Sequence, residues 1–320
     1  MPQYTMMSYN IEHMRKMFNK NNVRKDSKER LQKVAKIIKN IDPHILGVVE
    51  ASNKLKHHEV LVNDPDYLNG RFQIAKSEVN RGSQDLVVYY RDPFEVLEVD
   101  TNVDFYAPWL EDIDDDGIQE LCDFERVPLE ILFRIKGTDI RFYLILILSK
   151  SKGVFAVNDL LTYQRMALSN RKKLFAQAKK IRRRLDQILD MENPIPVIVM
   201  GDMNDEPGLD EYQKQVGASS IETLMGSIFD PKKIMHNALW HLSSDDHNRE
   251  LWTAEFPDQI VSYSKNHRVW IDHILVSPDM IVSESKFRYV MDSGSICQKD
   301  EIAKAASDHY PIFCQFEHDE

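Results

Sequence analysis

The sequence predicts an α/β fold in which mixed sheets are covered on their outer sides by helices. Short runs rich in Val, Ile, Tyr and Phe recur along the chain between turn residues, and this composition is typical of strands. Two longer segments carry apolar residues at helical spacing. Because strands dominate and do not alternate regularly with helices, mixed sheets are favoured over a repeated βαβ order.

Strands are predicted at residues 4–11, 45–50, 85–90, 128–135, 140–148, 197–201, 271–276 and 312–316. A first helix is expected to begin near Ser27 and to stop at Asp42-Pro43, because the residue before a proline disfavours helix. A second helix is expected at residues 168–189. Its apolar stripe consists of Leu174, Ala178, Ile181, Leu185 and Ile188.

The composition is that of one large globular domain. The chain has 320 residues, of which 42% are hydrophobic and 29% charged, so it can bury a sizeable core. We expect a single domain over residues 1–320 and a monomer. The net charge of -10 argues against a basic nucleic-acid coat protein, but not against an enzyme whose metal offsets local carboxylates.

The expected location is cytoplasmic. Cys122, Cys297 and Cys314 match no zinc spacing and are expected to be reduced. The N-terminus lacks the basic and apolar regions of a signal peptide. The longest apolar run, at residues 142–148, is too short to span a bilayer.

Polar residues stand at or next to the ends of four apolar runs. They are Asn10, Glu50, the pair Asp202 and Asn204, and the pair Asp308 and His309. Each residue read alone is typical of a cap or turn. Four such places in one chain favour another interpretation, because burying a carboxylate is costly unless something compensates it. Together they predict oxygen ligands around a hard cation such as Mg²⁺.

The segment RVWIDHILVS adds a fifth element. Strand alternation puts Asp272 on one face with Trp270 and Ile274, so the carboxylate needs a partner there. His309 would satisfy Asp272 and would be held in one tautomer by it. Backbone amides are the alternative partners.

These five elements, in this order, resemble the endonuclease/exonuclease/phosphatase family of metal-dependent phosphoesterases. The motifs that carry the resemblance are VVE, GDMND, RVWIDHILVS and SDHYP, and with Asn10 they span residues 10–309. The resemblance implies a four-layer α/β sandwich of two packed mixed sheets flanked by helices. It places the site at one end of the sheets.

The resemblance also implies a Mg²⁺ or Mn²⁺ cofactor. Glu50 would bind the metal directly, and Asp308 and Asn10 would lie close to the metal or the phosphate.

The same resemblance implies the catalytic roles. Asp202 would orient or deprotonate the attacking water, and the Asn204 amide would hold the phosphate or the transition state. His309, oriented by Asp272, would donate a hydrogen bond to the phosphate.

The chain departs from the family after the strand at 140–148. Many members have a histidine in an H-x-K-S segment there, and alignment on Lys150 and Ser151 puts Leu148 at that histidine. Three explanations stay open. Tyr163 or Asn158 supplies the missing group, as a tyrosine and an asparagine do in abasic-site nucleases. Alternatively activity is reduced or lost, or the leucine was introduced artificially.

Basic and aromatic residues are candidates for substrate contact. The helix residues 171–184 are rich in Lys and Arg, which fits either phosphate contact or a solvated outer face. Arg165 and Arg171 lie nearer the predicted site and are the better candidates. Trp240 and Trp252, in a polar segment at 227–268 expected to form ordered loops, are available to stack on a base.

The segment EDIDDDGIQELCD predicts a second cation site. Asp112, Asp114 and Asp116 are followed by Gly117, as in the first half of an EF-hand-like calcium loop. Helical flanks are not evident, so an acidic surface loop is the alternative to bound Ca²⁺.

The predicted function is phosphodiester hydrolysis dependent on Mg²⁺ or Mn²⁺, with a nuclease favoured and nucleic acid as the substrate. One alternative is a phosphatase acting on an inositol phosphate or a phospholipid. The other is a weakened family member that binds without turnover.

Overall fold

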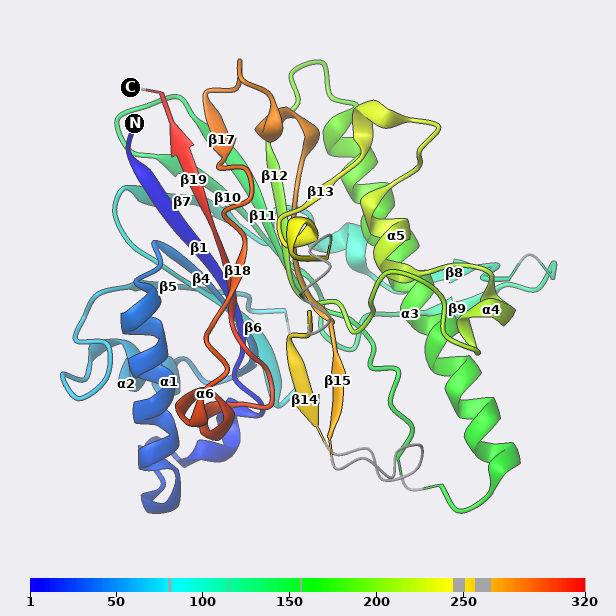
Figure 1. Cartoon of the computed structure of the whole chain (residues 1–320), viewed down its shortest axis with the longest axis horizontal. Helices are drawn as coiled ribbons and strands as arrows, with labels where there is room; N and C mark the ends of the chain where they lie inside the picture. The colour runs from blue at the N-terminus through cyan, green and yellow to red at the C-terminus, as the bar shows by residue number, and fades with distance from the viewer. Residues whose placement is uncertain (80–81, 115, 156, 244–250, 257–265, 320) are drawn as a thin grey trace.

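The computed structural model describes residues 1–79, 82–114, 116–155, 157–243, 251–256 and 266–319. Two large mixed sheets lie face to face, with helices on both outer sides (Figure 1). One sheet has the strand order β17-β19-β1-β4-β6-β5, and β18 also pairs with β19. The other has the order β13-β16-β12-β11-β10-β7.

The strands of the first sheet are β1 (Gln3–Asn10), β4 (Ile45–Ser52), β5 (Gln73–Lys76), β6 (Gln84–Tyr90), β17 (Phe287–Tyr289), β18 (Ser295–Ile296) and β19 (Ile312–His318). Those of the second are β7 (Phe94–Val99), β10 (Leu129–Ile135), β11 (Arg141–Leu148), β12 (Val197–Asp202), β13 (His236–Asn237) and β16 (Asp272–Val276). Three hairpins stand apart: β2 (Phe18–Asn19) with β3 (Asn22–Val23), β8 (Trp109–Glu111) with β9 (Glu120–Cys122), and β14 (Ala254–Phe256) with β15 (His267–Val269).

The helices are α1 (Lys28–Ile41), α2 (Leu55–Asn63), α3 (Leu160–Leu189), α4 (Gln213–Val216), α5 (Ser220–Met225) and α6 (Glu301–Ala306). Short 3₁₀ turns lie at η1 (Met14–Met17), η2 (Lys25–Ser27), η3 (Val103–Tyr106), η4 (Pro231–Lys233), η5 (Trp240–Ser243) and η6 (Pro278–Ile281).

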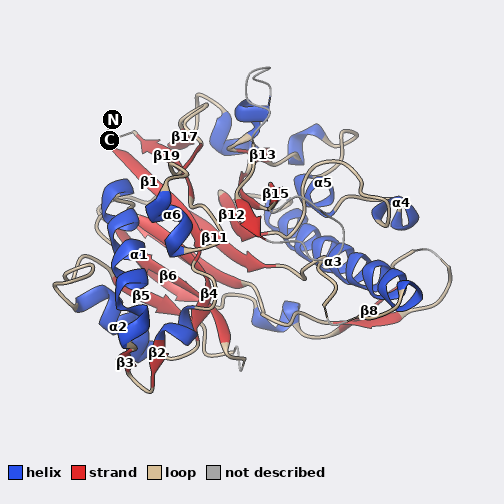
Figure 2. Ribbon diagram, turned by 60° about the horizontal axis from the view of Figure 1, so that its bottom comes forward, coloured by secondary structure: helices blue, strands red, loops and turns tan. Residues whose placement is uncertain are grey.

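Alternate residues of the central strands face different apolar cores. In β1, Met6 lies between the sheets and Met7 faces α1. In β12, Met200 lies between the sheets and Val199 faces α3. Burial on both faces explains why these strands are almost continuously apolar. Three cores therefore separate four layers, with α1, α2 and α6 outside one sheet and α3 and α5 outside the other (Figure 2). This confirms the predicted four-layer sandwich.

The second predicted helix is longer than its apolar stripe. α3 begins at Leu160, eight residues before the predicted start at Leu168. The Asp159 side chain caps it by accepting a hydrogen bond from the Thr162 amide at 2.8 Å. Leu160 and Leu161 in the first turn are exposed, so no core-facing periodicity marks this end of the helix.

The segment 227–268 contains more regular structure than the predicted loops. It contributes β13 to the second sheet and forms the β14–β15 hairpin, while residues 244–250 and 257–265 lie outside the described part.

Among the described residues, no helix has the length and apolar character needed to cross a membrane. Cys122, Cys297 and Cys314 are all free thiols.

Candidate active site

The predicted site residues gather at one end of the two facing sheets. Asn10 and Glu50 lie on the neighbouring parallel strands β1 and β4 of one sheet, and Asp202 and Asp272 lie on the antiparallel strands β12 and β16 of the other. His309 follows Asp308 in the short segment that leads into β19. The strand ends therefore bring residues from both sheets to one place.

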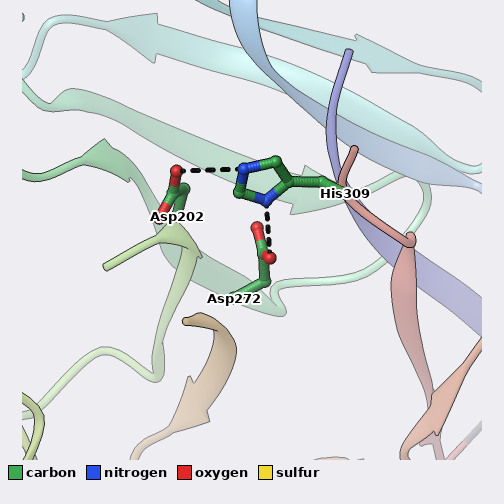
Figure 3. A group of neighbouring side chains, drawn as sticks. All are labelled: Asp202, Asp272 and His309. Atoms are coloured by element: carbon green, nitrogen blue, oxygen red, sulfur yellow. Dashed lines mark hydrogen bonds and ion pairs between the residues drawn. The ribbon is translucent and has the colours of Figure 1, made fainter. Parts of the chain in front are cut away.

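His309 lies between two buried aspartates (Figure 3). Its Nδ1 is 2.8 Å from Asp272 Oδ2, and its Nε2 is 3.8 Å from Asp202 Oδ2. Because a carboxylate accepts only, Nδ1–H must donate to Asp272. The ring is thereby oriented with Nε2 toward Asp202, and the predicted Asp272–His309 contact is present.

Asn10 links the two sheets at this point. Its Nδ2 donates to Asp202 Oδ2 at 3.1 Å and lies 3.4 Å from His309 Nε2. Its Oδ1 accepts from the Glu12 amide at 2.9 Å, which fixes the amide orientation. The Asn10 carbonyl accepts from the Ser307 hydroxyl at 2.8 Å, and this ties β1 to the segment that carries Asp308.

Glu50 is aimed by a local irregularity of its strand. The register of β4 against β6 shifts between Val48 and Ala51, and Glu50 itself has a left-handed φ of 52°. Such bulges redirect a side chain, and left-handed backbone is uncommon outside glycine. Glu50 Oε2 accepts from the His13 amide at 2.9 Å and from Gln84 Nε2. No pattern in the sequence indicated His13 or Gln84 as partners of this carboxylate.

Burial and mutual repulsion raise the pKa of several carboxyl groups here. Burial is the largest cause for Asp202, Asp308 and Glu12. The charge of Glu50 adds to the pKa increase in all three. A cation placed among them would relieve this repulsion, and carboxylate and amide oxygens are the ligands that Mg²⁺ and Mn²⁺ prefer. The donor set therefore fits a divalent metal.

Glu12 was not among the predicted ligands. Its carboxylate lies 3.1 Å from Arg30 Nη2, and its pKa rises through burial and then through Asp308. An acid two residues after a strand-end asparagine is the sequence signal that points to it.

The pKa of His309 is raised to about 10. Burial alone lowers it, but the Asp272 carboxylate, through its charge and its hydrogen bond, outweighs burial, and Asp202 adds to the rise. The two aspartates therefore favour the protonated imidazole, in which Nε2–H is a donor.

Asn204 turns back toward Asp202 through an unusual backbone. Its φ is 52°, and its backbone N–H donates to Asp202 Oδ1 at 2.9 Å. Its Nδ2 donates to the Ser149 carbonyl at 3.1 Å. Gly201, with φ 140°, leaves a Cβ position only 2.0 Å from the Ile147 carbonyl oxygen, so no larger residue fits there.

Arg171 is engaged within the protein. Its guanidinium forms an ion pair with Asp210 at 2.8 Å and donates to the Lys152 carbonyl at 2.7 Å. Its side chain is 12% exposed. This arrangement anchors the loop after β11, and contact of Arg171 with a substrate stays a prediction.

The other residues predicted to contact the substrate differ in their exposure. Arg165 is exposed on α3. Tyr163 is half-buried, and its ring lies 6.3 Å from that of Tyr212. Trp240 is exposed, whereas Trp252 is buried against Tyr310 and is not free to stack on a base.

The basic residues of α3 are largely paired with the β8–β9 hairpin and the sheet. Lys172 bridges Asp114 and Glu120, and Lys179 and Arg183 share Glu111. Arg184 pairs with the buried Glu130 at 2.6 Å. These ion pairs therefore stabilise the packing of α3 against the β8–β9 hairpin and the sheet. The two interpretations of the sequence, a phosphate contact or a solvated outer face, did not anticipate the ion pairs.

The predicted calcium loop forms a compact acidic turn. Carboxylate oxygens of Asp112, Asp114 and Asp116 lie within 4.8 Å of one another. Asp112 accepts from the amides of Asp116 and Gly117 at 3.2 and 3.0 Å, and Lys172 already neutralises Asp114 at 2.6 Å. Bound Ca²⁺ stays a prediction for this loop.

The arrangement of the site agrees with the comparison to known families. The sequence model of the Endonuclease/Exonuclease/phosphatase family matches residues 7–309, so this chain belongs to that family. Its members are generally hydrolases of phosphoester bonds that depend on a divalent metal. No curated protein sequence matches the chain.

Solved structures share the fold. TDP2 from D. rerio, complexed with a single-strand DNA product, is 12% identical with a TM-score of 0.56, covering 98% of this chain and 99% of that one. The human Nocturnin catalytic domain with bound sulfate is 16% identical with a TM-score of 0.55, covering 99% and 95%. An endonuclease/exonuclease/phosphatase from Bacteroides vulgatus is 18% identical with a TM-score of 0.53, covering 100% of both chains.

Proposed function

We propose that this protein hydrolyses phosphodiesters with Mg²⁺ or Mn²⁺, and that nucleic acid is its substrate. The observation that carries the proposal is the placement of His309 between Asp272 and Asp202, beside the carboxylates Glu50 and Asp308. A phosphodiester is anionic, so its hydrolysis needs donors on the phosphate oxygens, an acceptor for a proton of water and neutralisation of charge.

Glu50, Asp308 and Asn10 would hold the metal. When bound, the metal neutralises the nonbridging oxygens and acidifies water. Asp202 has a raised pKa, so its carboxylate suits acceptance of a proton from the attacking water near neutral pH. Asn204 would add an amide donor to the phosphate.

His309 would act as a fixed cationic donor. Asp272 holds Nδ1, so Nε2–H is the nitrogen left for a phosphate oxygen. Asn10 Nδ2, 3.4 Å from Nε2, lies close enough to approach the same oxygen.

The DNA product in the D. rerio TDP2 structure supports nucleic acid as the substrate class, and the exposed Arg165 is a suitable phosphate contact. A phospholipid is the second candidate. It is favoured by exposed apolar side chains after Leu148, where β11 ends: Phe155 before α3, and Leu160 and Leu161 in the first turn of α3.

The test is turnover of bis-p-nitrophenyl phosphate, single-stranded DNA, duplex DNA and a choline phospholipid in vesicles. Each substrate is assayed with Mg²⁺, with Mn²⁺ and with EDTA. The same assays are run on Glu50→Gln and on Glu59→Gln, a control on the outer helix α2 where Glu59 pairs with Lys56. Metal-dependent cleavage of DNA, lost in Glu50→Gln and kept in Glu59→Gln, is expected. Cleavage of lipid alone would replace nucleic acid by phospholipid, and no turnover of any substrate would favour a family member that binds without catalysis.

A further inference from the structure

The Asp272–His309 hydrogen bond crosses from one sheet to the other. Asp272 begins β16 in the six-stranded sheet, and His309 precedes β19 in the seven-stranded sheet. This 2.8 Å contact depends on how closely the start of β16 and the segment that leads into β19 are held together. The segment 253–255, at the start of the β14–β15 hairpin, is hydrogen-bonded to both.

On the side of Asp272, the segment is attached through the hydroxyl of Thr253. Thr253 Oγ1 accepts from the amides of Ile271 and Asp272 at 3.1 and 3.0 Å. The Thr253 amide donates to the Val269 carbonyl at 2.8 Å. One side-chain oxygen thus fixes the backbone of the residue whose carboxylate orients His309.

On the side of His309, the segment is attached through its backbone. The Thr253 carbonyl accepts from the Tyr310 amide at 2.7 Å, and the Glu255 amide donates to the Asp308 carbonyl at 2.8 Å. Ala254 forms an antiparallel bridge with His309 itself. The residues on both sides of His309, Asp308 and Tyr310, are therefore hydrogen-bonded to this segment through their backbones.

The segment is firmly packed. Thr253 and Ala254 are fully buried. The adjacent Trp252 meets the Tyr310 ring edge-on at 5.0 Å, and the Lys299 and Arg268 cations lie 3.8 and 4.6 Å from its ring centre. Buried hydrogen bonds in such surroundings are not exchanged for water and hold one geometry.

We propose that Thr253 is a positioning residue that sets the distance and orientation of the Asp272–His309 pair. Its hydroxyl holds the backbone of Asp272, and its carbonyl holds the segment that carries His309. The consequence for catalysis rests on the proposed phosphodiesterase function, but the consequence for the hydrogen bond does not.

The test compares Thr253→Val, which keeps the shape and removes the hydroxyl, with Thr253→Ser, which keeps the hydroxyl. Thr223→Val is the matched control, because the hydroxyl of Thr223 in α5 donates to the carbonyl of Ser219, the residue before that helix. If the valine variant does not fold, Thr253→Cys takes its place, since a thiol is only a weak acceptor. Two readouts are taken on folded protein. One is steady-state kinetics with Mn²⁺, which gives kcat and KM, and the other is the downfield proton resonance of His309 Nδ1–H in metal-free protein.

Thr253→Val is expected to lower kcat about 10- to 100-fold with KM within about twofold, because small misplacements of a catalytic group cost that much. Its His309 proton signal is expected to broaden or vanish. Thr253→Ser and Thr223→Val should keep both readouts. A valine variant with the parent's kcat and proton signal would overturn the proposal. If no phosphodiester is turned over but the signal still depends on the hydroxyl, the proposed function fails and the positioning role stands.

Discussion

Leu148 of β11 lies directly beside Asp202 of β12. The two residues are partners in the parallel register of the six-stranded sheet, so their side chains point to the same face. Asp272 is the partner of Asp202 on its other side. The buried hydrocarbon side chain of Leu148 therefore lies in line with Asp202 and Asp272 across three neighbouring strands. Many members of the family have a histidine at this position.

Replacing this leucine by histidine is expected to increase turnover. Loss of one transition-state donor typically costs about 10²–10³-fold in rate, so Leu148→His should raise kcat by about 10²-fold. The measurement is kcat on bis-p-nitrophenyl phosphate with Mn²⁺. Leu148→Met, of similar volume and without a donor, is the control and should match the parent. A histidine variant no faster than the methionine variant would show that this position does not limit the chemistry.

The Asp272 carboxylate is expected to control the protonation of His309. In Asp272→Asn, burial acts on the imidazole without its main opposing charge, so the pKa of His309 should fall from about 10 by more than about one unit. Histidine-selective NMR titration of metal-free protein measures this change. His58, whose pKa burial lowers to about 4, serves as an internal reference. Titration of His309 still near pH 10 in the variant would contradict the assignment.

Local patterns in the sequence were sufficient for the inner strands of both sheets and for several site residues, but they did not predict the edge strands β5, β7, β13 and β17. The alternation around Asp272 predicted an inward carboxylate, and the strand ends predicted the positions of Asn10 and Asp202. The pairing of His309 with Asp272 followed from the same alternation and from the need of a buried charge for a partner.

Long-range partners and backbone irregularities left no such pattern. The bulge at Glu50 and its contact with Gln84 depend on how β6 meets β4. The charges of Lys172 and Arg183 are neutralised by a hairpin more than 50 residues earlier in the chain, so composition alone made α3 resemble a phosphate-binding surface.

Arg171 is expected to contribute to stability more than to substrate binding. Arg171→Met removes the ion pair with Asp210 and the donor to the Lys152 carbonyl, which should lower the free energy of unfolding by about 1–3 kcal/mol. Urea unfolding measures this loss, and KM for DNA should stay unchanged. Arg165→Met, at an exposed position of the same helix, should leave stability unchanged. An increase in KM for DNA in Arg171→Met, without a loss of stability, would instead support Arg171 as a substrate contact.

Two buried histidines are expected to make the protein less stable in acid. Burial lowers the pKa of His58 and of His273 to about 4, against an ordinary value of 6.5. Each ring accepts one hydrogen bond and donates one: His58 contacts Tyr89 Oη and the Ser52 carbonyl at 2.6 and 2.7 Å, and His273 contacts Asn237 Nδ2 and the Asp205 carbonyl, both at 2.9 Å. Both rings are therefore neutral in the folded protein.

The sign of the effect follows from the lowered pKa values. Between the ordinary value of 6.5 and about pH 4, the unfolded chain binds a proton at each histidine that the folded chain does not. Their contribution to stability is complete above pH 6.5 and is lost as the pH falls toward 4, with a slope of about 1.4 kcal/mol per pH unit for each histidine. Urea unfolding between pH 5 and about pH 7 measures the slope. His58→Gln should be less stable at neutral pH but should show a slope smaller by the contribution of about one histidine. An unchanged slope in His58→Gln would mean that this ring takes up its proton equally in the folded and unfolded chains.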